Sequence, residues 1–282
     1  MPDRPSQRPP NPPGEPFGAE APSLGAEWRR ATLFLGLHDA DDLRKRLDDC
    51  GIIDRLAGLG FRSLHFEIEP LSIEGQSMRL YDEMAAPERL LMELRLRVRQ
   101  IVPALRLVNE EPLHEVRMLG VEWGLLQNPR AAFTPDRPPL PDQRHPGLGL
   151  AGKATRLIEG FARDHHCDGV LSFPQHYHNA VIYAHRFVCF HPARQGALRA
   201  MMRDLTERGL AERSFAIDAG CLVAEPGGRS VAWKGSEMVL PISRRLADWV
   251  GSRFWRAEAR QAECAHRWRI DWERFDRLPE KG

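Results

Sequence analysis

The stretch RHPGLGLAGKATRLIEGFARDHHCDGVLSF, residues 144–173, decides the fold class. Two glycines, Gly147 and Gly149, stand just before a segment with apolar residues at helical spacing. These apolar residues, which predict an amphipathic helix ending near His166, are Ala154, Leu157, Ile158, Phe161 and Ala162. The short apolar run Val170–Phe173 follows and predicts a strand. A strand that directly follows such a helix is typical of an α/β domain.

The glycine loop in front of this helix has the chemistry of an anion site. The first turn of a helix leaves several backbone N–H groups unpaired, and the helix dipole adds partial positive charge there. Glycine lets a phosphate approach the backbone closely, and Lys153 adds a charge in the first turn. An ordinary turn that opens a helix fits the same residues, so the loop alone leaves both interpretations open.

The loop together with a later segment resembles the GNAT superfamily of N-acetyltransferases. The loop carries the spacing Arg-x-x-Gly-x-Gly at Arg144–Gly149, and the later segment is NAVIYAHRF at Asn179–Phe187. In that superfamily such a loop binds the pyrophosphate of acetyl-CoA through backbone amides. The strand after the helix diverges from its neighbour to admit the pantetheine arm. The resemblance implies a GNAT-like mixed central sheet flanked by helices, with extra C-terminal strands and a C-terminal helix.

Carried over by position, the resemblance implies roles for individual residues. The cofactor-binding residues would be Arg144, Gly147, Leu148, Gly149, Leu150 and Asn179. Tyr183 would be the general acid that protonates the departing thiolate. Glu122, in the expected strand Val116–Gln127, would be the base, and a backbone N–H of the diverging strand would stabilise the oxyanion. The sequence departs from the family pattern by a proline-rich insertion, Asn128–Gln143, between that strand and the loop.

The rest of the chain is expected to supply further strands and helices. On the N-terminal side these are a strand at Thr32–Leu37, a helix capped by Asp39 or Asp41, a half-buried strand at Leu64–Ile68, a short helix after Pro87 and a strand at Leu94–Val98. On the C-terminal side they are a helix at Gln195–Leu205, strands at Ser214–Val223, Ser230–Trp233 and Met238–Ile242, and a long helix at Arg244–Trp268.

Composition excludes several classes of protein. The 282 residues include 40 Lys and Arg against 39 Asp and Glu, so a net charge of +1 gives no strong field for nucleic acid or an acidic membrane. No apolar run approaches the ~20 residues that span a bilayer. The five cysteines form no CxxC pair, which favours a reducing compartment over a disulfide framework. Because the N-terminus shows no apolar leader, we expect a cytoplasmic location.

We expect three parts along the chain. Residues 1–26 hold eight of the 23 prolines and are expected to form a disordered tail. Residues 27–112 would form the N-terminal α/β part of the fold. Residues 113–282 would form an acyl-CoA-binding, GNAT-like part with a C-terminal extension.

The function that these features favour is transfer of an acetyl or short acyl group from acetyl-CoA, or another acyl-CoA, to an amine. The acceptor would be a small molecule or a peptide; we expect no nucleic acid or membrane partner, and a homodimer is possible. One alternative is a catalytically silent member of the same fold that binds a ligand or a partner. A Cys167 or Cys189 nucleophile is conceivable, although buried structural thiols fit both positions better.

A third hypothesis is a metal-dependent hydrolase built on a cluster of histidines. These are His165, His166, His176, His178, His185 and His191. A His-x-His pair in a strand would place both imidazoles on one face, which suits a metal pair. No complete ligand motif accompanies them, so ordinary surface or core histidines fit the pattern as well.

Overall fold

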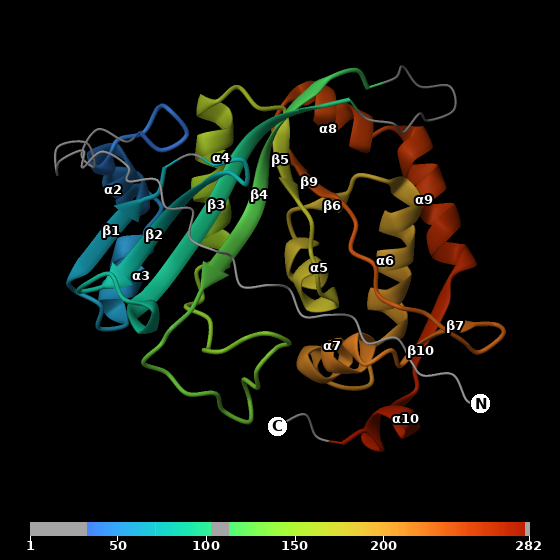
Figure 1. Ribbon diagram of the computed structural model, residues 1–282. Helices are drawn as coiled ribbons and strands as arrows, with labels where there is room; N and C mark the ends of the chain where they lie inside the picture. Colours follow the sequence, from blue (N-terminus) through green and yellow to red (C-terminus); the bar gives the residue numbers. More distant parts are fainter. Residues whose placement is uncertain (1–32, 71, 103–112, 280–282) are drawn as a thin grey trace, which may run out of the picture. The chain divides into compact units, whose positions relative to one another are not determined.

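A seven-stranded mixed sheet organises residues 33–70, 72–102 and 113–279, the residues that the computed structural model describes (Figure 1). Its order is β1-β2-β3-β4-β5-β9-β6. The strands are β1 (Leu64–Ile68), β2 (Gln76–Asp82), β3 (Leu90–Ile101), β4 (Val116–Leu126), β5 (Gly169–Ser172), β6 (Val188–Cys189) and β9 (Met238–Pro241). Neighbours pair antiparallel except β4 and β5, which pair parallel. The expected α/β class with a mixed sheet and flanking helices is confirmed, and the tail expected at 1–26 lies outside the described residues.

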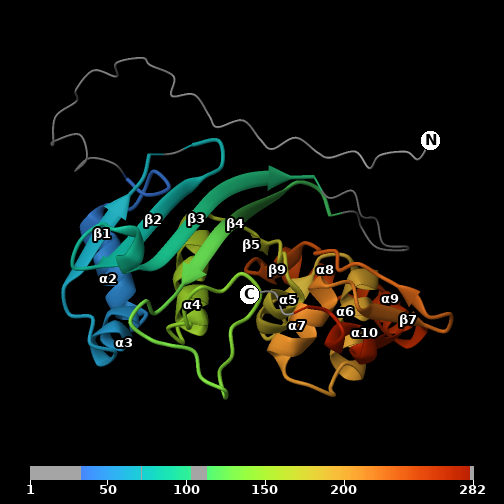
Figure 2. The ribbon, with the colours of Figure 1, turned by 60° about the horizontal axis from the view of Figure 1, so that its bottom comes forward.

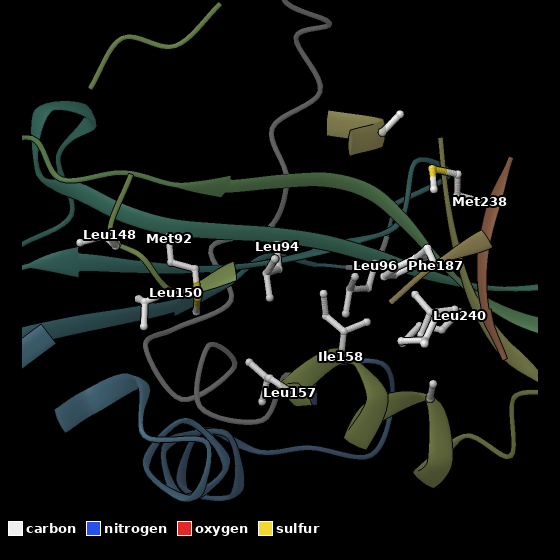
Figure 3. Close-up of a cluster of buried hydrophobic side chains, with 14 of the residues drawn as sticks. Met92, Leu94, Leu96, Leu148, Leu150, Leu157, Ile158, Phe187, Met238 and Leu240 are labelled. Carbon is white, nitrogen blue, oxygen red and sulfur yellow. The ribbon is translucent and has the colours of Figure 1, made fainter. Parts of the chain in front are cut away.

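Three helices cover one face of strands β1 to β4 (Figure 2). They are α2 (Ala40–Asp49), α3 (Ile52–Gly58) and α4 (Ala151–Asp164). Leu157 and Ile158 of α4 point toward Leu94 and Leu96 of β3, and all four side chains are buried (Figure 3). Burial of side chains of this size contributes about 1.5–3 kcal/mol each, so this contact fixes α4 firmly against the sheet.

The opposite face of these strands is charged. Side chains alternate along a strand, so the residues between the buried ones point away from α4. On that face Arg79 of β2 pairs with Glu93 of β3 at 2.8 Å, and Arg99 of β3 pairs with Glu122 of β4 at 2.7 Å. The short helix expected after Pro87 is a single 3-10 turn, Pro87–Arg89, which leads into β3.

The C-terminal part of the sheet lies between two groups of helices. Helices α5 (Tyr177–Tyr183), α6 (Pro192–Asp204) and α7 (Leu210–Asp218) share a core with β5 and β6, whereas α8 (Arg244–Val250) and α9 (Arg253–Ala265) pack with the opposite side of β4 and β9. A second sheet of order β10-β7-β8 follows, built from β10 (Arg267–Ile270), β7 (Leu222–Glu225) and β8 (Arg229–Ser230). The chain continues into α10 (Trp272–Asp276).

Several expected elements differ in the structure. The apolar run expected as a strand at Thr32–Leu37 is, over its described residues, a tight turn closed by a bridge between Phe34 and His38. Leu35 and Gly36 both have positive φ, which a strand does not allow. The segment expected as a strand at Ser214–Val223 is mostly helix α7. Gly220 at φ +76° ends this helix, because the Cys221 N–H bonds back to the Ala216 carbonyl, and only then does β7 begin.

Two further predictions at the C-terminal end are wrong in extent. The strand expected at Ser230–Trp233 is reduced to β8, and the helix expected over Arg244–Trp268 divides into α8 and α9. The division occurs because the Ser252 hydroxyl accepts a hydrogen bond from the Trp255 N–H at 3.2 Å and so starts a new helix. Elsewhere the Asp39 carboxylate caps α2 by accepting a hydrogen bond from the Asp42 N–H. Asp39 is one of the two residues expected as the cap. Within the described ranges, no helix is both long and apolar enough to cross a membrane.

Candidate functional site

The glycine loop begins at the end of β4, although an insertion separates the two in sequence. The Asn128 N–H donates a hydrogen bond to the Pro146 carbonyl at 2.7 Å, so the insertion leaves and returns at one point. A Cβ at Gly147 would lie 3.7 Å from the Leu126 carbonyl, the last residue of β4. The loop therefore lies next to the end of β4 in space, although the insertion separates them in sequence.

Two buried leucines anchor the loop on either side of a glycine. Leu148 and Leu150 are each 1% exposed, and they point into the core beside Met92 (Figure 3). Gly149 between them is exposed and has φ +71°, a conformation that favours glycine. This alternation anchors the loop in the core and leaves Gly149 at the surface.

The first turn of α4 offers unpaired backbone donors. Leu150 at the N-cap makes no side-chain cap, and the first helical bond runs from the Ala154 N–H to the Leu150 carbonyl at 2.8 Å. Among the described residues, nothing accepts from the N–H groups of Ala151, Gly152 or Lys153. Together with the helix dipole, three such donors in a 14-residue helix favour a bound anion.

Two cations flank the loop. Arg55 of α3 donates from Nε to the Leu148 carbonyl at 3.3 Å, and its guanidinium lies 3.5 Å from where a Cβ at Gly149 would be. Lys153 donates from Nζ to the Cys50 carbonyl at 3.4 Å. The sequence singled out Lys153 but not Arg55, because Arg55 lies 93 positions before its partner and no local pattern links the two.

Strands β4 and β5 diverge next to this loop (Figure 1). Only four residues of each strand pair: Met118–Val121 of β4 with Gly169–Ser172 of β5. At the next position β4 carries an extra residue, Glu122, because Val121 opposes Leu96 whereas Trp123 opposes Arg95. Beyond Val121 no described strand pairs with the β5-facing edge of β4, so its backbone groups there are free to meet a ligand.

Tyr183 lies where the two strands separate. It is the last residue of α5 and is half-buried. Burial raises the pKa of its hydroxyl, and a hydrogen bond with the Ser172 side chain opposes that rise. Ser172 sits opposite Val121 in the last pair of the β4–β5 ladder. The Tyr183 hydroxyl is therefore protonated near neutral pH and close to the divergence.

Three further site residues were expected. Arg144 is exposed just before the loop, and the other two lie elsewhere. Glu122 faces the opposite side of the sheet, where its carboxylate is paired with Arg99. Asn179 lies one helical turn before Tyr183 on α5, half-buried, and is not part of the loop. The structure thus gathers the loop residues at one end of α4, places Tyr183 at the divergence and keeps Glu122 on the far face.

The histidine pair that sequence reasoning placed in a strand belongs to helix α5. His176 is its N-cap, and its two ring nitrogens meet Asp218 at 2.7 Å and Asp142 at 3.0 Å. His178 stacks on it at 5.2 Å between ring centroids. Burial lowers the pKa of His178 to about 4, and the neighbouring His176 adds to this effect.

These contacts give His176 two carboxylate partners and place His178 against its ring. In the part of the chain that the structure describes, no three His, Cys, Asp or Glu side chains are grouped as a metal site. The hydrolase hypothesis therefore has no ligand set among these residues. Cys167 and Cys189 are buried, and burial raises the pKa of both thiols, that of Cys189 to about 12. Such thiols are poor nucleophiles.

Comparisons with protein-family models, with curated proteins and with solved structures found no match to this chain.

Proposed function

We propose that the protein binds an acyl-CoA at the Gly147–Leu150 loop and transfers the acyl group to an amine. The observation that carries the proposal is the position of the loop. The loop and the unpaired amides of α4 lie at the end of β4. β4 leaves β5 five residues earlier, after Val121, and the Tyr183 hydroxyl lies near Ser172 at that point. This is the arrangement that the resemblance to the GNAT superfamily implies.

The anion-binding half of the site would hold the pyrophosphate. The amides of the loop and of the first turn of α4 would donate to its oxygens, and Arg55 and Lys153 would add positive charge. Leu148 and Leu150 keep these donors in place without entering the site, because both side chains are buried in the core. Preorganised donors of this kind hold an anion with little loss of entropy.

The reacting half would lie between the diverging strands. A neutral amine forms a bond to the thioester carbonyl carbon, and the carbon–sulfur bond then breaks. Tyr183 would donate the proton of its buried hydroxyl to the departing thiolate. Glu122, reached from the opposite face of the sheet, would accept the ammonium proton through water, while Arg99 holds its carboxylate in place. Free backbone groups of β4 beyond Val121 would stabilise the oxyanion.

Calorimetric titration of acetyl-CoA and CoA tests the binding step. Gly147→Glu places a carboxylate among the amides, and Gly147→Gln adds the same bulk without charge. We expect Gly147→Glu to weaken binding by at least about tenfold relative to Gly147→Gln, which corresponds to ~1.4 kcal/mol. Equal affinities of the two variants, or no saturable binding to the wild-type protein, would reject the loop as the pyrophosphate site.

Tyr183→Phe distinguishes an enzyme from a silent binding protein. If transfer occurs, this variant keeps its affinity for acetyl-CoA but loses most of the turnover seen with a panel of amines. Removal of one general acid typically costs about 10²–10⁴-fold. A wild-type protein that binds acetyl-CoA and acetylates no amine would support the silent alternative instead.

A further inference from the structure

A cavity of about 510 Å³ lies beside α6, away from the glycine loop. Its walls come from α6, from the β7–β8 hairpin, from residues 231–236 and from β9. No residue of the loop at 144–150 lines it. Cavities of this size are large enough for a small organic ligand.

The interior of the cavity is apolar. Leu198 and Met201 of α6, Leu222 of β7 and Met238 of β9 all line it, and each is at most 4% exposed. The rings of Trp233 and Trp268 complete the lining. An apolar body would be released from water on entering, which favours a ligand with a hydrocarbon or aromatic part.

Positive charge surrounds this apolar interior. Arg194, Arg229 and Lys234 line the cavity, and all three are exposed. Within the described part of the chain, no carboxylate is part of the lining. Among the described residues none of the three cations makes an ion pair, whereas most arginines on the charged face of the sheet do. An acidic group on the ligand would therefore find three partners and no repulsion.

Two buried donors at the cavity have no acceptor. The indole N–H groups of Trp233 and Trp268 are buried, and no described residue accepts a hydrogen bond from either. Buried donors usually have a partner, because an unpaired one loses its hydrogen bond to water without replacement. The two tryptophans therefore leave hydrogen-bonding capacity unused in the wall of the cavity.

We propose that this cavity binds a small organic carboxylate with an apolar body, such as a medium-chain fatty acid. The hydrocarbon part lies against Leu198, Met201 and Met238, and the carboxylate lies toward Arg229 and Lys234. An amine of the same shape meets three like charges, and a neutral alcohol leaves the cations without a counter-charge. The proposal stands on the cavity alone and does not depend on acyl transfer at the glycine loop.

Titration with decanoate, decanol and decylamine tests both the site and the charge preference. Intrinsic tryptophan fluorescence reports binding, because Trp233 and Trp268 line the cavity. We expect saturable binding of decanoate below about 1 mM, at least about tenfold tighter than that of decanol, and none of decylamine. Equal affinity for decanoate and decanol, or no saturable binding of decanoate in this range, would overturn the proposal.

Two variants locate the binding site. Arg229→Glu reverses a charge at the cavity, and Arg199→Glu makes the same change at an exposed position of α6 outside it. We expect at least about a tenfold loss for Arg229→Glu and none for Arg199→Glu. Ala197→Trp, which fills the cavity, should abolish decanoate binding but leave acetyl-CoA binding unchanged. Decanoate binding that survives both Arg229→Glu and Ala197→Trp in folded protein would place it elsewhere and reject the cavity.

Discussion

The glycine loop before α4 and the cavity beside α6 both present positive charge, but they are constructed in opposite ways. The loop uses backbone amides from one continuous stretch, and Gly149 within it is exposed. The cavity uses side chains drawn from Pro174 to Trp268, almost a hundred positions apart. A backbone site of the first kind is encoded locally, whereas a side-chain site of the second kind exists only once the fold brings distant segments together.

Glycine plays a different structural role in each region. In the loop it permits the left-handed backbone of the exposed Gly149. Next to the cavity it permits close packing: a Cβ at Gly196 of α6 would lie 2.2 Å from the Ala259 carbonyl and 2.6 Å from the Ala262 side chain. Helices α6 and α9 touch backbone to backbone there, so the wall of the cavity depends on one missing methyl group.

The largest expected effect on stability comes from a change at this close contact between α6 and α9. Gly196→Ala forces α6 and α9 apart, because the atoms that the new methyl meets are mostly backbone and cannot rotate away. We expect the free energy of unfolding to fall by about 2–4 kcal/mol. Chemical denaturation measures the change. A free energy equal to that of the wild-type protein would show that the two helices do not approach as closely as described.

A smaller effect concerns pH. The pKa of His178 is lowered to about 4 in the folded chain, against an ordinary value of 6.5. The unfolded chain therefore takes up a proton between these values that the folded chain does not. The contribution of His178 to the free energy of unfolding is present above pH 6.5 and is lost as the pH decreases toward 4. Between about pH 7 and about pH 5 we expect a loss of about 1–2 kcal/mol, after allowance for solvent screening.

His178→Leu isolates this contribution, because leucine cannot titrate. The difference in melting temperature between neutral and acidic buffer should be smaller in His178→Leu than in the wild-type protein. The same acid dependence in both proteins would contradict a buried neutral imidazole. Helix α5 beside the cavity carries this buried histidine, whereas the buried side chains that anchor the loop are Leu148 and Leu150, which do not titrate.

The smallest expected effect is on stability at the first turn of α4, beside the glycine loop. Gly152 lies in the first turn of α4, and a Cβ there meets no atom within 4 Å. Gly152→Ala should therefore stabilise the protein by about 0.5 kcal/mol, through restriction of the unfolded chain and better helix propensity. Differential scanning calorimetry would show a small rise in melting temperature. A fall would mean that the first turn of α4 is more crowded than the structure indicates.

The local elements were largely predictable from the sequence. Helix α4, strands β1, β4 and β5 and the loop before α4 follow from periodicity and glycine placement, because each is encoded within about ten to fifteen neighbouring residues. Strand β2 was not predicted from the sequence, for a physical reason. It lies between β1 and β3 with six of its seven residues buried, so it lacks the alternation that marks a half-exposed strand.

What depends on distant contacts could not be predicted. Arg55 reaches the loop from α3, and the cavity gathers residues from several elements. The apolar run at Ser214–Val223 fits a strand as well as a helix, and only the left-handed turn at Gly220 separates α7 from β7. The roles of Tyr183 and Glu122 stay predictions, since geometry places them but only kinetics can assign them.

The insertion at Asn128–Gln143 has a consequence for evolution and engineering. Its ends are joined by the hydrogen bond from Asn128 to Pro146, and Asp142, close to its C-terminal end, is held by His176. A segment whose ends meet can be lengthened, shortened or exchanged without rethreading the sheet. Selection can therefore reshape this border of the molecule while β4 and α4 remain as they are, and a designer can graft a new loop at the same two anchor points.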